Sequence, residues 1–228
     1  MNRTAAEAQA ECVGAMGPEL GEIYSALWQE VALIHSKWNE FVVLYGTKES
    51  RIDLLNQAAP RFARLIQDVL WDDVLLHLAR LTDVEKSTGI RKLSIRALPA
   101  LVKDTDTKIA VAAAVNVARS ACEFARDWRN RRLAHLELAV ALDPGAKPLA
   151  PASRQHVNQA LQSLAAALNV VSQRYLNSTS LFDIRWNDAG GALSLLHVLH
   201  DGVRTQEARD ARLKSGIFDL SDMSPNDL

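Results

Sequence analysis

Three arginines and one histidine lie within seven consecutive residues of this chain, the segment RNRRLAH at positions 129–135. An arginine side chain is charged at any working pH, and its planar guanidinium donates paired hydrogen bonds to phosphate oxygens. A histidine side chain exchanges a proton near neutral pH, because its unperturbed pKa is about 6.5. Together, Arg129 and His135 have the chemistry to bind a phosphodiester, stabilise its transition state and move a proton.

A second interpretation of this segment is purely structural. The segment closes a long helical run, and Arg and His side chains at the end of a helix offset the negative end of the helix dipole. Basic helix ends of this kind are common. The local sequence therefore leaves a phosphate site and a basic helix terminus as two open interpretations.

The elements that must position the segment are helices. Apolar residues recur with helical spacing, and no run alternates convincingly with the period of a strand. A break is expected before Pro60, because the residue before a proline avoids helical dihedrals. We predict an all-α bundle of about five helices with a C-terminal helical extension. The expected helices cover residues 19–45, 53–83, 105–138, 153–175 and 192–214.

The length of 228 residues fits one large domain, or one domain with an extension. We predict three parts. Residues 1–18 form an N-terminal segment and 19–176 form the bundle. Residues 177–228 form an irregular segment, a helix and a frayed tail that contains Ser224-Pro225.

The predicted helix 53–83 places charges where apolar residues are expected. Projected on an ideal helix, Asp73 and Arg80 lie in the middle of an apolar stripe. The stripe consists of Phe62, Leu65, Ile66, Val69 and Leu76. Asp83 follows Arg80 by three residues and is placed to pair with it.

The predicted helix 105–138 repeats this pattern, since Arg129 and Arg132 fall on its apolar face. Charges are rarely placed on such a face unless they are paired, hydrated or functional. The simplest explanation is an ion pair across the bundle, from Asp73 or Asp83 to one of the two arginines. The functional explanation is a polar cleft on this face that a second subunit closes.

The composition restricts the classes of partner. The net charge is −1 and the pI is about 6.6, so any contact with nucleic acid must come from a local basic patch. Cys12 and Cys122 lie far apart in the sequence, which argues against a disulfide framework and fits a reducing cytoplasm. No apolar stretch approaches the length of a membrane span. We therefore expect a cytoplasmic protein without a membrane partner.

Two groups of residues have the spacing of metal ligands. His197 and His200 lie three residues apart with Asp201 adjacent, and Asp73 lies four residues before His77. Neither group has a clear third ligand from elsewhere in the chain, and such groups are more often polar helix faces. We predict no metal and no cofactor.

The wider sequence around these charges is similar to the HEPN superfamily. The segment 129–135 resembles its R-x(4–6)-H motif, with a polar residue directly after the arginine. In their order along the chain, further segments look like the HEPN-like branch named after an abortive-infection phage-defence protein of the Abi U type. These segments are LYG at 44–46, IDLLN at 52–56, DDVLL at 72–76 and ARLTD at 79–83.

The resemblance implies a function and a site. Many HEPN proteins are metal-independent endoribonucleases that act as homodimers, with RNA cut by attack of its 2′-hydroxyl. By this resemblance Arg129 would hold the scissile phosphate, and His135 would act as general base or acid. Asn130 would contact phosphate or orient the histidine. Further candidate supports are Arg131, Arg132, Asp73, Arg80 and Asp83.

The prediction is therefore an endoribonuclease in phage defence or a toxin–antitoxin setting, with an antitoxin or sensor protein as a possible partner. Glu137 stands where some HEPN toxins carry a tyrosine that is adenylylated, so that regulation is not expected. The alternative is a non-catalytic HEPN-like module that binds a nucleotide or a protein. An open cleft lined by Arg129 and His135 of two subunits favours the nuclease. Arginines buried against aspartates, with His135 in solvent, favour the module.

Overall fold

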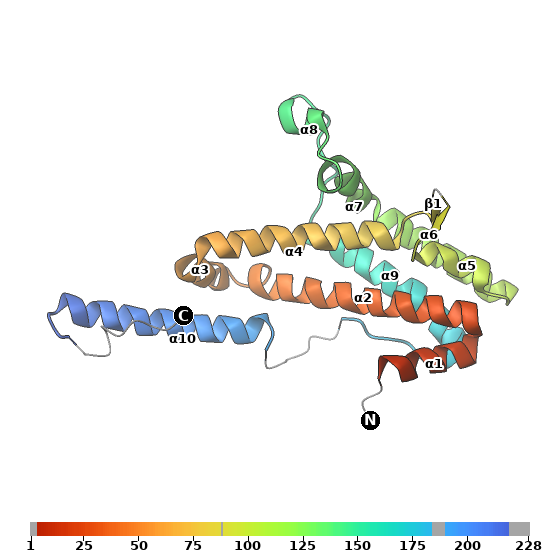
Figure 1. The fold of residues 1–228 in the computed structure, drawn as a ribbon, viewed down its shortest axis with the longest axis horizontal. Coiled ribbons are helices and arrows are strands. Elements are labelled where there is room, and N and C mark those ends of the chain that lie inside the picture. The colour runs from red at the N-terminus through yellow and green to blue at the C-terminus, as the bar shows by residue number, and fades with distance from the viewer. Residues whose placement is uncertain (1–3, 88, 184–189, 219–228) are drawn as a thin grey trace. The chain divides into compact units, whose positions relative to one another are not determined.

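The computed structural model describes residues 4–87, 89–183 and 190–218, and these residues fold into helices (Figure 1). Within them are ten α-helices, one 3-10 turn, one π-helical turn and a two-stranded antiparallel hairpin. The predicted all-α bundle is therefore confirmed. The first helices are α1 (Ala5–Met16), α2 (Pro18–Tyr45), α3 (Glu49–Ala58) and α4 (Pro60–Leu81). The hairpin β1 (Lys86–Ser87) and β2 (Ile90–Arg91), the turn η1 (Ile95–Ala97), α5 (Leu98–Leu101) and α6 (Thr105–Ala121) follow. The last elements are α7 (Glu123–Trp128), η2 (Arg129–Leu133), α8 (Leu138–Leu142), α9 (Arg154–Leu176) and α10 (Ala192–Lys214).

The described residues divide into two compact units. The first unit takes in residues 1–38 and 70–184, and the second takes in 39–69 and 185–228, as far as these are described. The division into segments 1–18, 19–176 and 177–228 stays a prediction. The frayed tail predicted around Ser224-Pro225 lies outside the described residues.

The first unit has an apolar core between its long helices. α6 lies against α9, and α1 also contacts α9 (Figure 1). Trp38 of α2 donates a hydrogen bond from Nε1 to Oδ1 of Asn158 on α9 at 2.6 Å, and its ring lies 6.0 Å from that of Trp71 on α4. The fully buried side chains of this core include Leu27, Val31, Ile34, Leu75, Leu78, Ile95, Leu98, Val111, Leu164 and Leu168.

The second unit contains the end of α2, α3, the start of α4 and α10. α3 packs against α10, and Gln57 donates a hydrogen bond to Glu207 at 2.7 Å. The carboxylate of Glu40 accepts a hydrogen bond at 2.6 Å from the backbone N–H of Ala192, the first residue of α10. This contact satisfies an N–H group that the helix leaves without an internal partner.

Most predicted helix boundaries are confirmed. α2, α9 and α10 match the expected ranges, and a break at Ala59 separates α3 from α4. Ser153 caps α9 by accepting a hydrogen bond from the N–H of His156. Helix α1 was not predicted, although Thr4 and Glu7 form the reciprocal capping box that starts it.

The predicted apolar stripe of α4 was wrong. Phe62, Leu65 and Val69 are 61%, 58% and 53% exposed, whereas buried residues define a different stripe. The buried stripe consists of Val74, Leu75, Leu78, Ala79 and Leu81. Helix α4 carries two apolar stripes, and the one in its second half packs into the core of the first unit.

Replacement of Leu78 by Ala tests this core. Because Leu78 is fully buried, Leu78→Ala should lower the free energy of unfolding by about 2–5 kcal/mol, measured by urea denaturation followed by circular dichroism. Ile109 on α6 is 65% exposed and loses similar atoms in Ile109→Ala, which should change stability by less than about 0.5 kcal/mol. Equal losses in the two variants would contradict the assignment of the core.

Candidate functional site

The segment 129–135 does not continue an α-helix as predicted. Cys122 interrupts the helical run between α6 and α7. Residues 129–133 then form the π-helical turn η2, which Ala134 closes by donating its N–H to the carbonyl of Arg129 at 2.8 Å. His135 lies beyond this turn, in a bend outside the helix. Single π-helical turns occur frequently at functional sites.

Arg129 is held by two neighbours. Its Nη1 donates to the carboxylate of Asp83, which lies just beyond the end of α4, and the two side chains form an ion pair. Its Nε and Nη2 donate to Oδ1 of Asn130 at 3.0 and 2.8 Å. A guanidinium has five N–H groups, so about two remain for a ligand. The side chain is 22% exposed, which leaves these groups accessible.

Asp83 is fixed from the other side. Its backbone carbonyl accepts a hydrogen bond from the hydroxyl of buried Ser94 at 2.7 Å. Its carboxylate is only 12% exposed, and Nζ of Lys92 lies 3.9 Å from it. Of the ion pairs that the sequence left open, the structure therefore forms the one between Asp83 and Arg129.

The other two arginines of the segment differ in their partners. Arg131 donates to Glu137 at 2.7 Å and to the carbonyls of Lys147 and Pro148 at 2.6 and 3.1 Å. These bonds hold the loop before α9 in place. Few N–H groups of Arg131 therefore remain for a ligand. Arg132 is exposed, and its guanidinium carbon lies 5.3 Å from the ring centre of Trp128.

His135 is exposed in a bend directly after η2. Its ring makes no hydrogen bond and no ion pair to any residue of the described chain. The imidazole is therefore accessible to a ligand and to solvent.

Asp73 and Arg80 are not brought to this segment. Asp73 pairs with Lys37 of α2 at 2.7 Å. Arg80 is 65% exposed and lies 3.4 Å from the carboxylate of Glu30, so the expected pair with Asp83 does not form. The two residues belong to a charged face between α2 and α4.

His77, also on α4, was not predicted to be buried. Its Nε2 lies 2.5 Å from the carboxylate of Glu30, and the side chain is 3% exposed. Burial lowers the pKa of His77 below its ordinary value, although the neighbouring Glu30 raises it. Nε2 is placed to donate a hydrogen bond to this carboxylate.

Arg126 is a further basic residue that the sequence interpretation missed. It donates from Nη1 to the hydroxyl of Thr82 at 2.9 Å and from Nη2 to the carbonyl of Arg119 at 2.8 Å. Thr82 directly precedes Asp83, so the arginines of α7 and η2 contact adjacent residues at the end of α4. The available signal was the spacing of Arg119, Arg126 and Arg129, which places them near one side of an ideal helix.

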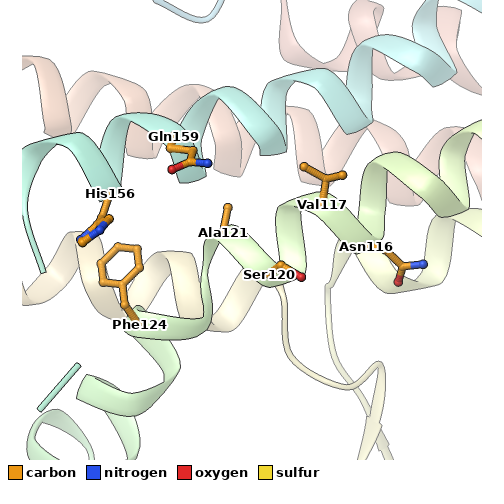
Figure 2. Close-up of a pocket in the computed structure, with 7 residues that line it drawn as sticks. All are labelled: Asn116, Val117, Ser120, Ala121, Phe124, His156 and Gln159. Carbon is orange, nitrogen blue, oxygen red and sulfur yellow. The ribbon is translucent and has the colours of Figure 1, made fainter. Parts of the chain in front are cut away.

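An open groove of about 610 Å³ lies between α6, α7 and α9 (Figure 2). The rings of Phe124 and His156 lie 5.5 Å apart at one end, with Gln159 next to them (Figure 2). The remaining lining residues all come from α6: Asn116, Val117, Ser120 and Ala121.

The described part of the chain contains no group of three His, Cys, Asp or Glu residues placed to hold a metal ion. Nδ1 of His200 lies 3.2 Å from the carboxylate of the adjacent Asp201. Cys122 is buried, and burial raises the pKa of its thiol to about 12, so it does not act as a nucleophile near neutral pH. In the residues that the structure describes, no helix is long and apolar enough to span a membrane.

The helical fold and the R-x5-H segment after α7 are the two features that the resemblance to HEPN proteins predicts. A family model described as HEPN AbiU2 matches residues 17–191, which is most of the chain. The chain therefore belongs to the AbiU2 family, the abortive-infection branch that the sequence segments resemble. Searches of curated proteins and of solved structures returned no match.

The buried histidines predict a dependence of stability on pH. Burial lowers the pKa values of His77 and His35, so below about pH 6.5 the unfolded chain binds protons that the folded chain does not. The free energy of unfolding should fall from pH 6.5 toward 5, by up to about 1.4 kcal/mol per pH unit for each histidine. His77→Gln should reduce this slope, measured by denaturation at several pH values. Exposed His200→Gln serves as the control, and equal slopes in both variants would refute the assignment.

The ion pair between Asp83 and Arg129 is measurable by a double-mutant cycle with Asp83→Asn and Arg129→Gln. Because the two side chains are only 12% and 22% exposed, a coupling of about 1–3 kcal/mol is expected, below that of fully buried pairs. The exposed pair Arg64–Asp68 is a matched control, with an expected coupling of at most about 0.5 kcal/mol. Similar coupling energies in the two cycles would show that Asp83 does not hold Arg129.

Proposed function

We propose that this protein is a metal-independent endoribonuclease of HEPN type that acts in phage defence or a toxin–antitoxin setting. The observation that carries the proposal is that Arg129 and His135, two residues of one segment, differ in their contacts. Arg129 is oriented by Asp83 and Asn130 with N–H groups to spare, and His135 is exposed and unengaged within the described chain. Membership of the AbiU2 family supports the same assignment.

The proposed reaction needs only these two kinds of group. The 2′-oxygen of a ribose attacks the adjacent phosphorus, the bond from phosphorus to the 5′-oxygen breaks, and a 2′,3′-cyclic phosphate and a 5′-hydroxyl result. Arg129 holds the phosphate and stabilises the charge of the transition state. His135 accepts the proton of the 2′-hydroxyl or supplies one to the leaving 5′-oxygen. DNA lacks the attacking hydroxyl and is not a substrate.

A homodimer is part of the proposal, since an exposed His135 in each chain is available to a site shared by two subunits. Arg132 is the candidate second phosphate contact, because it is exposed whereas Arg131 is used by Glu137 and the loop. Asp83 and Asn130 position Arg129. An antitoxin or sensor protein stays a candidate partner.

One observation favours a second function. The same ion pair of Arg129 with Asp83 and the same exposed His135 also fit a non-catalytic HEPN-like module that binds a nucleotide or a protein, although Arg129 is 22% exposed and is not fully buried against the aspartate. In that case the arginine has a structural role, and His135 contributes to no reaction. The two functions differ in whether His135 is required for cleavage.

Cleavage of labelled tRNA by purified protein distinguishes them. His135→Ala should reduce the rate about 10²–10⁴-fold because a general acid or base is removed, and Arg129→Ala should reduce it at least about 100-fold. His200→Ala, which removes another exposed histidine, should leave the rate unchanged. Unaltered melting curves would show that each variant folds. Equal rates for His135→Ala and the wild type would refute the proposal, and a wild type that binds RNA without cutting it would favour the module.

A further inference from the structure

Three half-buried arginines gather around the end of α4, outside the segment 129–135. Arg126 contacts both Thr82 and the backbone of Arg119. Arg96 follows Ser94, whose hydroxyl binds the carbonyl of Asp83 at 2.7 Å and accepts the N–H of Arg96 at 3.3 Å. We call Arg96, Arg119 and Arg126 the arginine cluster.

Within the described residues, the nearby carboxylates neutralise only part of the positive charge of the cluster. Asp83 is engaged by Arg129 and Lys92, and Glu123 lies 3.8 Å from Arg126 but is 80% exposed. In the part of the chain that the structure describes, Arg96 and Arg119 make no ion pair. Burial and then the charges of Arg119 and Arg126 lower the pKa of Arg96 below its ordinary value. Partly desolvated cations without counter-charges are costly, so an anionic ligand would stabilise this arrangement.

One hydrogen bond connects the cluster to a residue that lines the groove of Figure 2. Arg119 donates from Nη1 to Oδ1 of Asn116 at 3.1 Å, and Asn116 lines the groove. The groove offers aromatic rings in Phe124 and His156, and the amide of Gln159 (Figure 2). Nδ1 of His156 is buried and has no hydrogen-bond partner in the described chain.

We propose that this surface binds a single-stranded segment of RNA next to the scissile phosphate, with the arginine cluster on its phosphates and the groove around a base. Cations that adjoin an aromatic and amide-lined groove match the alternation of phosphate and base in a single strand. An acidic peptide would require only the cationic side chains and not the groove. That the bound strand is a substrate of the protein rests on the proposed function.

Binding of a fluorescent single-stranded 2′-O-methyl RNA oligonucleotide, which has no free 2′-hydroxyl to attack, tests the surface without cleavage. Affinity is measured by fluorescence anisotropy over a series of KCl concentrations. Each phosphate contact contributes about 0.7 to the slope of log affinity against log salt, so the double variant Arg96→Gln/Arg119→Gln should lower the slope by about 1.4. Arg64→Gln, which removes a 73% exposed arginine of α4 paired with Asp68, should leave the slope unchanged.

The groove is tested separately. Phe124→Leu keeps the apolar volume and removes the aromatic face, and it should weaken binding about fivefold or more without changing the salt slope. A slope in the double variant equal to that of Arg64→Gln would overturn the proposal. Equal competition by polyglutamate and by unlabelled oligonucleotide would also overturn it, in favour of an acidic protein partner.

Cleavage of unmodified RNA, measured in parallel, separates this inference from the proposed function. Wild-type cleavage with an unchanged slope and KM in the double variant would refute the arginine cluster and leave the nuclease standing. A lowered slope together with no cleavage by the wild type would support the RNA surface and refute the nuclease. A lowered salt slope of binding together with a raised KM of cleavage in the double variant would support both the RNA surface and the nuclease.

Discussion

The contact between Asp83 and Arg129 connects the motif segment to the helical bundle. A carboxylate that is 12% exposed requires a counter-charge, and the guanidinium of Arg129 supplies it. The hydroxyl of Ser94 fixes the backbone of Asp83, so the position of the arginine depends on the end of α4 and on the turn η1. Because the π-helical turn η2 ends at Leu133, His135 lies outside the helix.

Neighbouring basic residues have different roles because their partners differ. Arg131 is used by Glu137 and two loop carbonyls, whereas Arg132 lies exposed over Trp128. Arg129 combines features of both, because it has an acidic partner and also keeps unused N–H groups. A guanidinium oriented in advance binds phosphate at a smaller loss of conformational entropy, which is why a structural ion pair is compatible with a catalytic role.

Helical periodicity predicted the all-α class and the bounds of α2, α9 and α10, because long helices with one buried face leave a clear pattern. It failed where two patterns overlap, as on α4, whose exposed Phe62 and buried Leu78 lie on different stripes. No local signal marked the break at Cys122 or the π-helical turn. The choice of Asp83 over Asp73 as the partner of Arg129 depends on tertiary packing, which one sequence does not specify.

The central claim is that this fold cleaves RNA through the 2′-hydroxyl with its own side chains. Its most direct test is the chemistry of the ends produced when a defined RNA is incubated with the protein in EDTA, beside the same RNA carrying a single 2′-deoxy residue at the cut position. Fragments that end in a 2′,3′-cyclic phosphate and a 5′-hydroxyl, with no cut at the deoxy position, are the expected result. Cleavage at the deoxy position, or activity that EDTA abolishes, would contradict it.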